Sequence, residues 1–317
     1  MAAYIAQGNN SFTIYNPSPS TASQGYSYNY LQWNSVTITI TYEEAVSQPS
    51  VSSTSVNMGS AVTIYTNRVS TATTHTLLYT FGNTSGTIAT GVGASVSWTP
   101  ALTLAAQIPS ATSGTCTITC QSYNGGVLTG TRTYTLTLNV PSTIVPSISS
   151  VTVEDTNSTV ATRIQAYVKT LSTLSVDITA TGSYGSTVTS YRTSLDGVTY
   201  TAASFTASKK LSASGDMTLT VTVTDSRGRT ATYTETLTVL DYSYPSIRLF
   251  KADRCNSDGS AAQLDGTNVR YSFEGGVVSL NNKNALVCVV YYKLASDTEW
   301  TKSESLPVTS YNLSATD

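Results

Sequence analysis

The chain has 317 residues, a formal net charge of −2 and only 11% charged residues, whereas an average soluble protein has about 25%. This charge balance argues against nucleic acid as a partner, and no run approaches the ~20 apolar residues that a membrane-spanning helix needs. Apolar residues alternate with Ser and Thr along the chain, which argues against disorder and predicts antiparallel sheets with a Thr-rich outer surface.

Three segments of the chain begin with the same short motif. Proline, serine and an aliphatic residue occur at Pro49–Val51, Pro146–Ile148 and Pro245–Ile247, spaced by 97 and 99 residues. Proline suits the start of a strand because it cannot donate a hydrogen bond to a sheet. A period near one hundred residues exceeds the ~20–50 residues of solenoid repeats and matches a small β-sandwich of ~100 residues. The sequence therefore predicts an all-β array of sandwiches after a short β-rich N-terminal segment.

Residues 1–46 form the first predicted unit, which ends on the alternating strand Ser35–Tyr42. Its length is at the lower edge of what folds without disulfides or metal, so it is interpreted as an attachment region. Four aromatic residues gather in it and are the candidate ligand-binding residues: Tyr26, Tyr28, Tyr30 and Trp33. They would offer a surface to a glycan or a protein partner, or alternatively fill the small core of the segment itself.

Residues 47–141 form the first predicted sandwich. Its alternating strands are Ser60–Thr66, Thr74–Phe81, Gly86–Thr90, Ala94–Trp98, Cys116–Tyr123 and Thr131–Val140. Asn124-Gly125 between two such strands is a strong hairpin signal. Trp98 and Tyr134 are the aromatic residues expected in the core.

Residues 142–241 form the second predicted sandwich. Its expected strands are Ile148–Asp155, Leu174–Thr181, Val188–Ser194, Met217–Thr224 and Ala231–Leu240. In the hairpin between the last two, Asp225 is expected to bond the turn backbone and Gly228 to supply a positive φ. The flanking Arg227 and Arg229 are assigned to the turn, with no ligand role. Ala161–Thr173 could form a helical turn, but the β context favours a strand and a loop.

Residues 242–317 form the third predicted sandwich, which is shorter than the other two. Its expected strands are Ile247–Lys251, Val269–Phe273, Ala285–Leu294 and a stretch near Tyr311–Leu313. The internal period leaves this sandwich incomplete, and the natural polypeptide is expected to continue past Asp317.

The chain is poor in groups that could perform catalysis. His75 is the single histidine and alternates onto the face of Leu77, which favours a packed side chain over a general base. The adjacent carboxylates Glu43–Glu44 and Glu154–Asp155 would point to opposite faces of a strand. Asp253–Gly259 resembles a calcium loop but lacks the spacing and the closing glutamate, so a solvent-facing loop is favoured. The prediction is a non-enzyme with no catalytic residues, no metal site and no cofactor.

The four cysteines are predicted to be free thiols. Cys116 and Cys120 lie on one face of a strand with Cα atoms about 13 Å apart, beyond the ~7 Å limit for a disulfide. Cys288 is expected to be buried in a strand, and Cys255 to lie in a polar loop.

Three passages carry a resemblance to a known family. They are THTLLYTFGNTSGTIATGVG (74–93), WTPALTLAAQIPSATSGTCTITCQS (98–122) and VTDSRGRTATYTETLTVLDYSYPSIRLF (223–250). They resemble minor structural proteins of tailed phages and prophages of Gram-positive bacteria, which are built from tandem immunoglobulin-like domains, and the likeness covers about residues 35–317. It implies tandem immunoglobulin-like β-sandwiches and a component of the virion. It carries over no active-site residue.

Two functions follow as expectations. The first is a spacer in a tail fibre, tail tip or similar appendage, which contacts other virion proteins, assembles as a homo-oligomer and projects a distal host-recognition region. The alternative is a carbohydrate-binding module for host cell-wall glycans. Besides the N-terminal aromatic residues, Tyr184, Tyr191 and Tyr200 could contribute to such a site.

Overall fold

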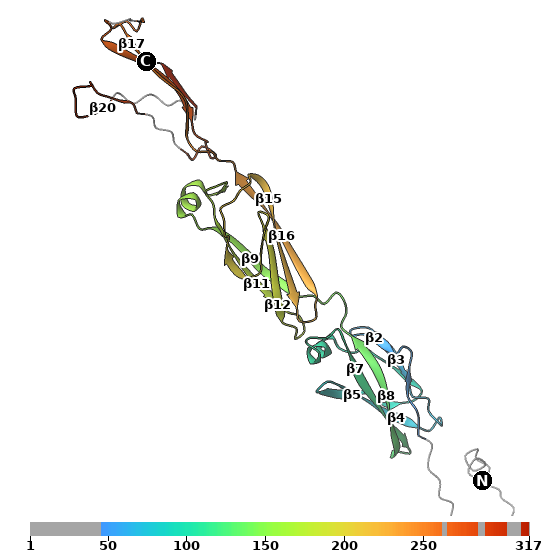
Figure 1. Ribbon diagram of the computed structural model, residues 1–317. Coiled ribbons are helices and arrows are strands. Elements are labelled where there is room, and N and C mark those ends of the chain that lie inside the picture. The colour runs from blue at the N-terminus through green and yellow to red at the C-terminus, as the bar shows by residue number, and fades with distance from the viewer. Residues whose placement is uncertain (1–45, 262–264, 285–288, 303–311, 317) are drawn as a thin grey trace, which may run out of the picture.

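The structure is a computed structural model, which describes residues 46–261, 265–284, 289–302 and 312–316. The described chain is almost entirely β and forms an elongated row, with two sandwiches end to end followed by a third unit (Figure 1).

The first sandwich consists of two sheets, in which all strand pairs except one are antiparallel. Its elements are β1 (Ser50–Val51), β2 (Ser55–Asn57), β3 (Val62–Tyr65), β4 (Thr74–Phe81), β5 (Thr84–Val92), β6 (Ser95–Trp98), the short helix η1 (Leu102–Gln107), β7 (Ser113–Asn124) and β8 (Val127–Asn139). One sheet has the order β1-β3-β6, and the other has the order β2-β8-β7-β4-β5. The short β2 pairs in parallel with β8, the last strand.

The second sandwich repeats this topology. Its elements are β9 (Ser147–Asp155), η2 (Val160–Ile164), β10 (Tyr167–Val168), β11 (Leu174–Thr181), β12 (Val188–Leu195), β13 (Val198–Tyr200), β14 (Ser204–Thr206), β15 (Gly215–Asp225) and β16 (Thr230–Leu240). The sheets have the orders β14-β11-β9 and β10-β16-β15-β12-β13, and the short β10 pairs in parallel with β16. The chain is therefore a tandem array of immunoglobulin-like sandwiches, as the resemblance implied.

The alternating sequence explains the two cores. On β15, Leu219, Val221 and Val223 are all 0% exposed, and the residues between them are threonines that are partly exposed. Successive side chains of a strand point to opposite faces, so the apolar set of each sheet lies between the two sheets. Each fully buried aliphatic side chain contributes about 1.5–3 kcal/mol.

The structure tests the predictions for Ala161–Thr173, for Cys255 and for the aromatic residues of the first core. Within Ala161–Thr173, the favoured strand and loop were wrong at the start, because Val160–Ile164 form a helical turn before the short β10. Cys255 ends a strand and is 4% exposed, so the expected polar loop was wrong there as well. Trp98 packs against the first core, with its ring 5.3 Å from that of Tyr79, while Tyr134 is partly buried on β8.

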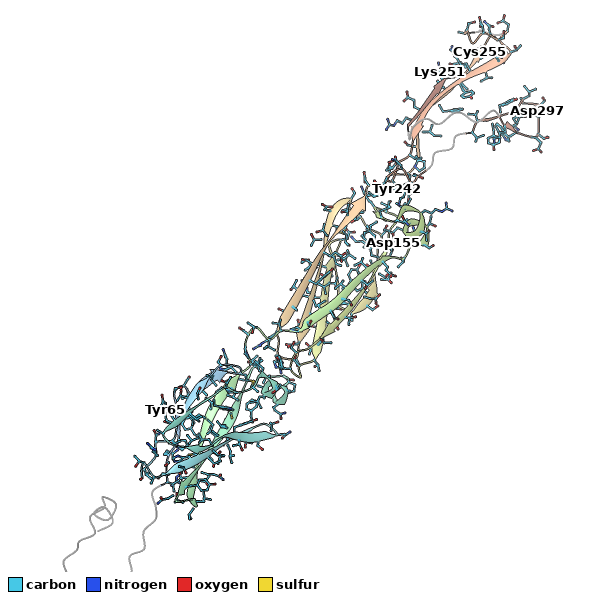
Figure 2. All side chains as sticks on the ribbon, turned by 180° about the vertical axis from the view of Figure 1, so that it is seen from behind. Tyr65, Asp155, Tyr242, Lys251, Cys255 and Asp297 are labelled. Atoms are coloured by element: carbon cyan, nitrogen blue, oxygen red, sulfur yellow. The ribbon has the colours of Figure 1, made fainter. Side chains whose placement is uncertain are left out.

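The described part of the third unit contains two small sheets. Its strands are β17 (Ser246–Cys255), β18 (Asn268–Gly276), β19 (Tyr291–Tyr292), β20 (Thr301–Lys302) and β21 (Asn312–Thr316), in the orders β17-β18-β21 and β19-β20. Leu280 is 6% exposed and packs with Val160 and Val168 of the second sandwich. Tyr242 packs against this cluster between the two units (Figure 2), and Lys283 donates a 2.8 Å hydrogen bond to the Ile164 carbonyl. Cys288 lies outside the described residues.

The thiols of the first core provide a probe of its unfolding. Cys116 and Cys120 are both free and 0% exposed, and burial raises the pKa of each thiol to about 11. We expect neither to react with iodoacetamide at pH 8 until urea unfolds the domain, because the thiolate is the nucleophile. Peptide mass spectrometry measures this residue by residue.

The same pKa shift predicts a pH dependence of stability. The pKa of both thiols is higher in the folded chain than the ordinary 9.0, so the free energy of unfolding should fall as the pH rises from about 9 to about 11. The Cys116→Ala/Cys120→Ala variant is the control, and its stability should fall less over this range. Equal slopes for the two proteins would contradict the prediction.

Candidate functional site: the joint between the first two sandwiches

The predicted N-terminal aromatic residues cannot be placed in a site. Tyr26, Tyr28, Tyr30 and Trp33 lie outside the described residues, so their role as a ligand-binding surface stays a prediction.

The three candidate tyrosines of the second sandwich lie in different surroundings. Tyr191 and Tyr200 are partly buried against the second core, and the Tyr200 ring stacks on Phe205 with centroids 4.2 Å apart. Tyr184 is 41% exposed and lies in the turn before β12, where its carbonyl accepts a hydrogen bond. One face of Tyr200 is thus covered by protein, which leaves less of its ring for a sugar.

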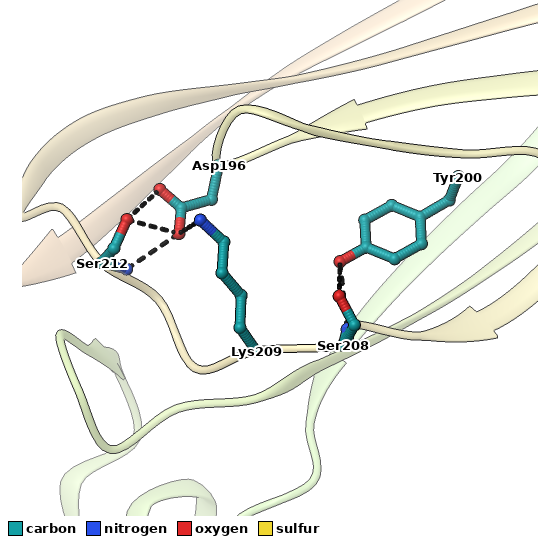
Figure 3. A network of polar contacts seen from close by, with 5 residues as sticks. All are labelled: Asp196, Tyr200, Ser208, Lys209 and Ser212. Carbon is teal, nitrogen blue, oxygen red and sulfur yellow. Dashed lines mark hydrogen bonds and ion pairs between the residues drawn. The ribbon is translucent and has the colours of Figure 1, made fainter.

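A polar network joins the turn after β12 to the segment after β14 (Figure 3). Asp196 accepts hydrogen bonds from the backbone N–H and the hydroxyl of Ser212 at 2.8 and 2.9 Å, and its carboxylate lies 3.5 Å from Lys209 Nζ. The Tyr200 hydroxyl lies 3.3 Å from the Ser208 Oγ. The network contains one carboxylate and one amine that neutralise each other, so its role is to hold two loops together.

This role gives a stability prediction. Asp196→Asn keeps a residue that tolerates the observed left-handed backbone (φ 47°) but removes the charge, and we expect it to lower the free energy of unfolding by about 1 kcal/mol. Asp177→Asn, at an exposed position of β11, is the control and should stay within about 0.5 kcal/mol of the parent. Urea unfolding measures both, and equal losses would contradict the assignment.

The single histidine is a buried structural residue, as the alternation of its strand indicates. His75 is 0% exposed, with Nδ1 2.9 Å from the Val92 carbonyl and Nε2 2.8 Å from the Ser47 hydroxyl. Both ring nitrogens are thus used within the fold, and no carboxylate is among these partners.

Other chemistry is sparse in the part of the chain that the structure describes. There, no three His, Cys, Asp or Glu side chains gather as a metal-binding group. None of the described helices has the length and apolar character needed to cross a membrane. The polar groups that stand out are two arginines at the tip of the β15–β16 hairpin.

The hairpin tip has the conformation that its sequence predicts. Asp225 is 2% exposed, and its Oδ1 accepts hydrogen bonds from the backbone N–H groups of Arg227 and Arg229 at 3.0 and 2.9 Å. Gly228 has φ 76°, the left-handed region that glycine adopts without steric cost. The tight turn projects both arginine side chains toward the first sandwich.

Arg227 donates hydrogen bonds both to the end of the first sandwich and to a turn of its own sandwich. Its Nη2 donates to the Ala105 carbonyl at 2.8 Å, and its Nε donates to the Ile108 carbonyl at 3.3 Å. Ala105 lies in η1, and Ile108 directly follows this helix. The same guanidinium donates at 2.7 Å to the carbonyls of Ser183 and Tyr184 in the turn before β12.

The charge of Arg227 is buried, and its hydrogen-bond acceptors among the described residues are backbone carbonyls rather than carboxylates. The side chain is 7% exposed, and burial lowers the pKa of its guanidinium, an effect that the nearby Asp225 opposes. An arginine stays protonated even so, and the carbonyl oxygens supply the partial negative charge that it requires.

Arg229 binds the linker between the two sandwiches. Its Nη2 donates to the Val140 carbonyl at 2.6 Å, and its Nη1 donates to the carbonyls of Ile144, at 2.7 Å, and Pro141. The linker is therefore held against the second sandwich along its length.

Two further contacts complete the joint, which we define as residues 105–109, 140–145, 183–185 and 225–229. Ser226 Oγ donates to the Pro109 carbonyl at 2.5 Å, and Ser183 Oγ donates to the Val145 carbonyl at 2.6 Å. Gly185 has φ 84°, and a Cβ there would lie 2.9 Å from the Cα of Ala106. The two backbones approach closely enough to require a glycine.

The joint is built from side-chain hydrogen bonds to the main chain. Every acceptor of the two guanidinium groups is a backbone carbonyl, and Arg227 uses three of its nitrogens on four carbonyls. Each of the two guanidinium groups thus donates at least three hydrogen bonds to the main chain. The sequence predicts this turn but not the contacts of its arginines, and the available signal was a pair of arginines around one glycine in a chain with only 16 Lys and Arg.

Comparison with known proteins gives one family and a set of structural neighbours. A family model described as siphovirus protein of unknown function (DUF859) matches residues 6–271. No curated protein matches the chain.

Structural neighbours include fibronectin(III)-like modules of Clostridium thermocellum CbhA, with 12% identity, a TM-score of 0.24 and coverage of 61% of this chain and 95% of that one. A calcium-stabilised adhesin that helps an Antarctic bacterium bind ice has 14% identity, a TM-score of 0.31 and coverage of 86% and 66%. Immunoglobulin domains 1–5 of Sidekick-1 have 12% identity, a TM-score of 0.31 and coverage of 72% and 55%. Likenesses this weak carry no inference about function.

Proposed function

Because this chain belongs to the family of siphovirus proteins of unknown function, DUF859, we propose that it is a non-enzymatic structural component of a tailed-phage virion. It acts as a spacer in a tail fibre, tail tip or similar appendage and projects a host-recognition region away from the particle. Other virion proteins, and further copies of this chain, would be its partners.

The arginine joint is the observation that supports a spacer. A spacer must hold its domains at a fixed orientation, whereas domains joined by a bare linker reorient freely. Here two guanidinium groups and two serine hydroxyls bind backbone carbonyls on both sides of the linker, and a glycine lets the backbones approach. Hydrogen bonds to charged groups contribute about 1.5–3 kcal/mol each, so several together restrain the orientation.

Electron microscopy of labelled particles tests the location. A gold-labelled antibody raised against residues 46–241 should bind intact virions of a phage that encodes this chain, at the tail or its appendages. An unrelated phage serves as the control. Label confined to the capsid, or virions that carry none while lysates do, would contradict the proposal.

A further inference from the structure

Two loops of the second sandwich form its side of the joint. They are the turn before β12, which includes Ser183 and Tyr184, and the tip of the β15–β16 hairpin at residues 225–229. Both lie at the end where the chain enters that sandwich, since β12 begins there and β15 ends there. The second sandwich thus docks on what precedes it through these two loops.

The first sandwich presents the equivalent two loops at its own entrance. They are residues 67–73 before β4 and the tip of the β7–β8 hairpin, and they are adjacent because Thr74 pairs with Tyr123. Figure 1 shows this end of β4 and β8 pointing away from the second sandwich. In the first sandwich these loops have no preceding domain among the described residues to cover them.

Aliphatic side chains are exposed on both loops. Val69 is 54% exposed, Val127 is 68% exposed and Leu128 is 50% exposed, and we call these three residues the N-proximal patch. They are half of the six large hydrophobic residues that are exposed in the two sandwiches. In the second sandwich the equivalent loops dock on the preceding domain. An exposed apolar patch at the same loops of the first sandwich therefore indicates that they too are a docking surface.

The path of the chain leads its N-terminal segment to this patch. A Cβ on Gly130 would clash with Val46 Cγ2, so Val46 packs directly on β8 at Gly130, two residues after Leu128. Ser47 is 1% exposed and bonded to His75, which holds the chain at this point. The described chain therefore begins at Val46 beside β8, close to the hairpin tip.

We propose that the N-proximal patch is the docking surface for residues 1–45 of this chain. That segment contains aromatic and aliphatic residues that can cover an apolar patch, and its only charged residues are Glu43 and Glu44. Arg132, exposed on β8, offers them the opposite charge. The family match begins at residue 6 and continues through both sandwiches, in agreement with a segment that belongs to the same structural unit.

The reach of the segment agrees with this assignment. Trp33 is thirteen residues before Val46. An extended chain spans at most ~3.6 Å per residue, so Trp33 lies within about 47 Å of Val46, and each later residue has a shorter maximum distance. The proposal is independent of where the protein lies on a virion, so it can fail while the spacer function holds.

Limited proteolysis of the full 317-residue chain tests it. Chymotrypsin would cut after Tyr26, Tyr28, Tyr30 or Trp33 when the segment is undocked, and intact mass follows the cuts. We expect the variant Val127→Asp/Leu128→Asp to be cut there about tenfold faster than the parent. The variant Ser85→Asp/Thr87→Asp, on exposed positions of β5, adds the same charge elsewhere and should behave as the parent does.

Two further measurements keep the test decisive. Cys116 and Cys120 should stay unreactive in the patch variant, and if they react, the milder Leu128→Ser variant replaces it. Equal cutting of parent, patch variant and control would overturn the proposal. It would also be overturned if light scattering found the parent dimeric and the patch variant monomeric, because the patch would then bind a second copy.

Discussion

Replacing Arg227 and Arg229 together with alanine should leave both sandwiches folded and free the orientation between them. The exchange removes the bonds from Arg227 to Ala105 and Ile108 and all bonds from Arg229 to the linker. The carbonyl groups that lose their donors regain hydrogen bonds from water if the joint opens, which favours the open state.

Small-angle X-ray scattering measures the outcome. We expect the distance distribution of the variant to broaden and its mean end-to-end distance to change, because a linker alone allows many orientations. Arg192→Ala/Lys210→Ala removes two exposed positive charges from the same sandwich and is the matched control. It should scatter as the parent does.

Replacing both arginines with lysine tests whether the joint needs the shape of the guanidinium groups or only their positive charge. Arg227→Lys/Arg229→Lys keeps both charges, but an ammonium group cannot reach four carbonyls as the planar guanidinium does. We therefore expect this variant to scatter like the alanine pair. Scattering identical to the parent for both variants would show that the arginines do not hold the joint.

The same alanine pair should cost the second sandwich some stability. Arg227 also bonds the Ser183 and Tyr184 carbonyls within that sandwich at 2.7 Å. Their loss should lower its free energy of unfolding by about 1–3 kcal/mol. Hydrogen exchange of the amides around the turn before β12 reports this change separately from the loss of orientation.

Replacing His75 with alanine should destabilise the first sandwich by about 3–5 kcal/mol. The imidazole is 0% exposed, so its removal leaves a cavity, and it also leaves the Val92 carbonyl and the Ser47 hydroxyl without a bonded ring nitrogen. Both costs act in the same direction. The urea midpoint, followed by the reactivity of Cys116 and Cys120, measures this sandwich alone.

Ser47→Ala is the graded comparison for this residue. It removes one partner and keeps the ring, so we expect a loss of about 1–2 kcal/mol. If His75→Ala and Ser47→Ala left the midpoint unchanged, the two hydrogen bonds would contribute nothing, and a purely space-filling role would remain for the ring.

The alternating pattern by itself determined the all-β fold and the faces of the strands. A strand in which Thr alternates with aliphatic residues can bury only its aliphatic face. The inward-facing residues of β15 and β7 therefore follow from the sequence. The turn at Asp225–Gly228 also followed, because a short carboxylate and a glycine act on their own local backbone. The same reasoning identified Cys116 and Cys120 as free thiols and His75 as a packed side chain.

Other features required the tertiary structure. The helical turn Val160–Ile164 lies where the chain passes from one sheet to the other, and Val160 and Ile164 pack in a cluster with Leu280 of the third unit. Tertiary packing therefore overrode the β context there. The burial of Cys255 at the end of β17 likewise depends on neighbours distant in sequence.

Arg227 and Arg229 show most clearly what the sequence determines and what only the tertiary structure decides. The sequence shows two arginines around a glycine, and the fold shows what they bind. Their acceptors are backbone carbonyls up to 122 residues away, and every residue carries such a carbonyl, so no side-chain pattern marks them. The sequence thus determined the sandwiches and their spacing. Only the tertiary structure decided how one sandwich is held against the next, because backbone carbonyls are alike in every residue and differ only in their position in space.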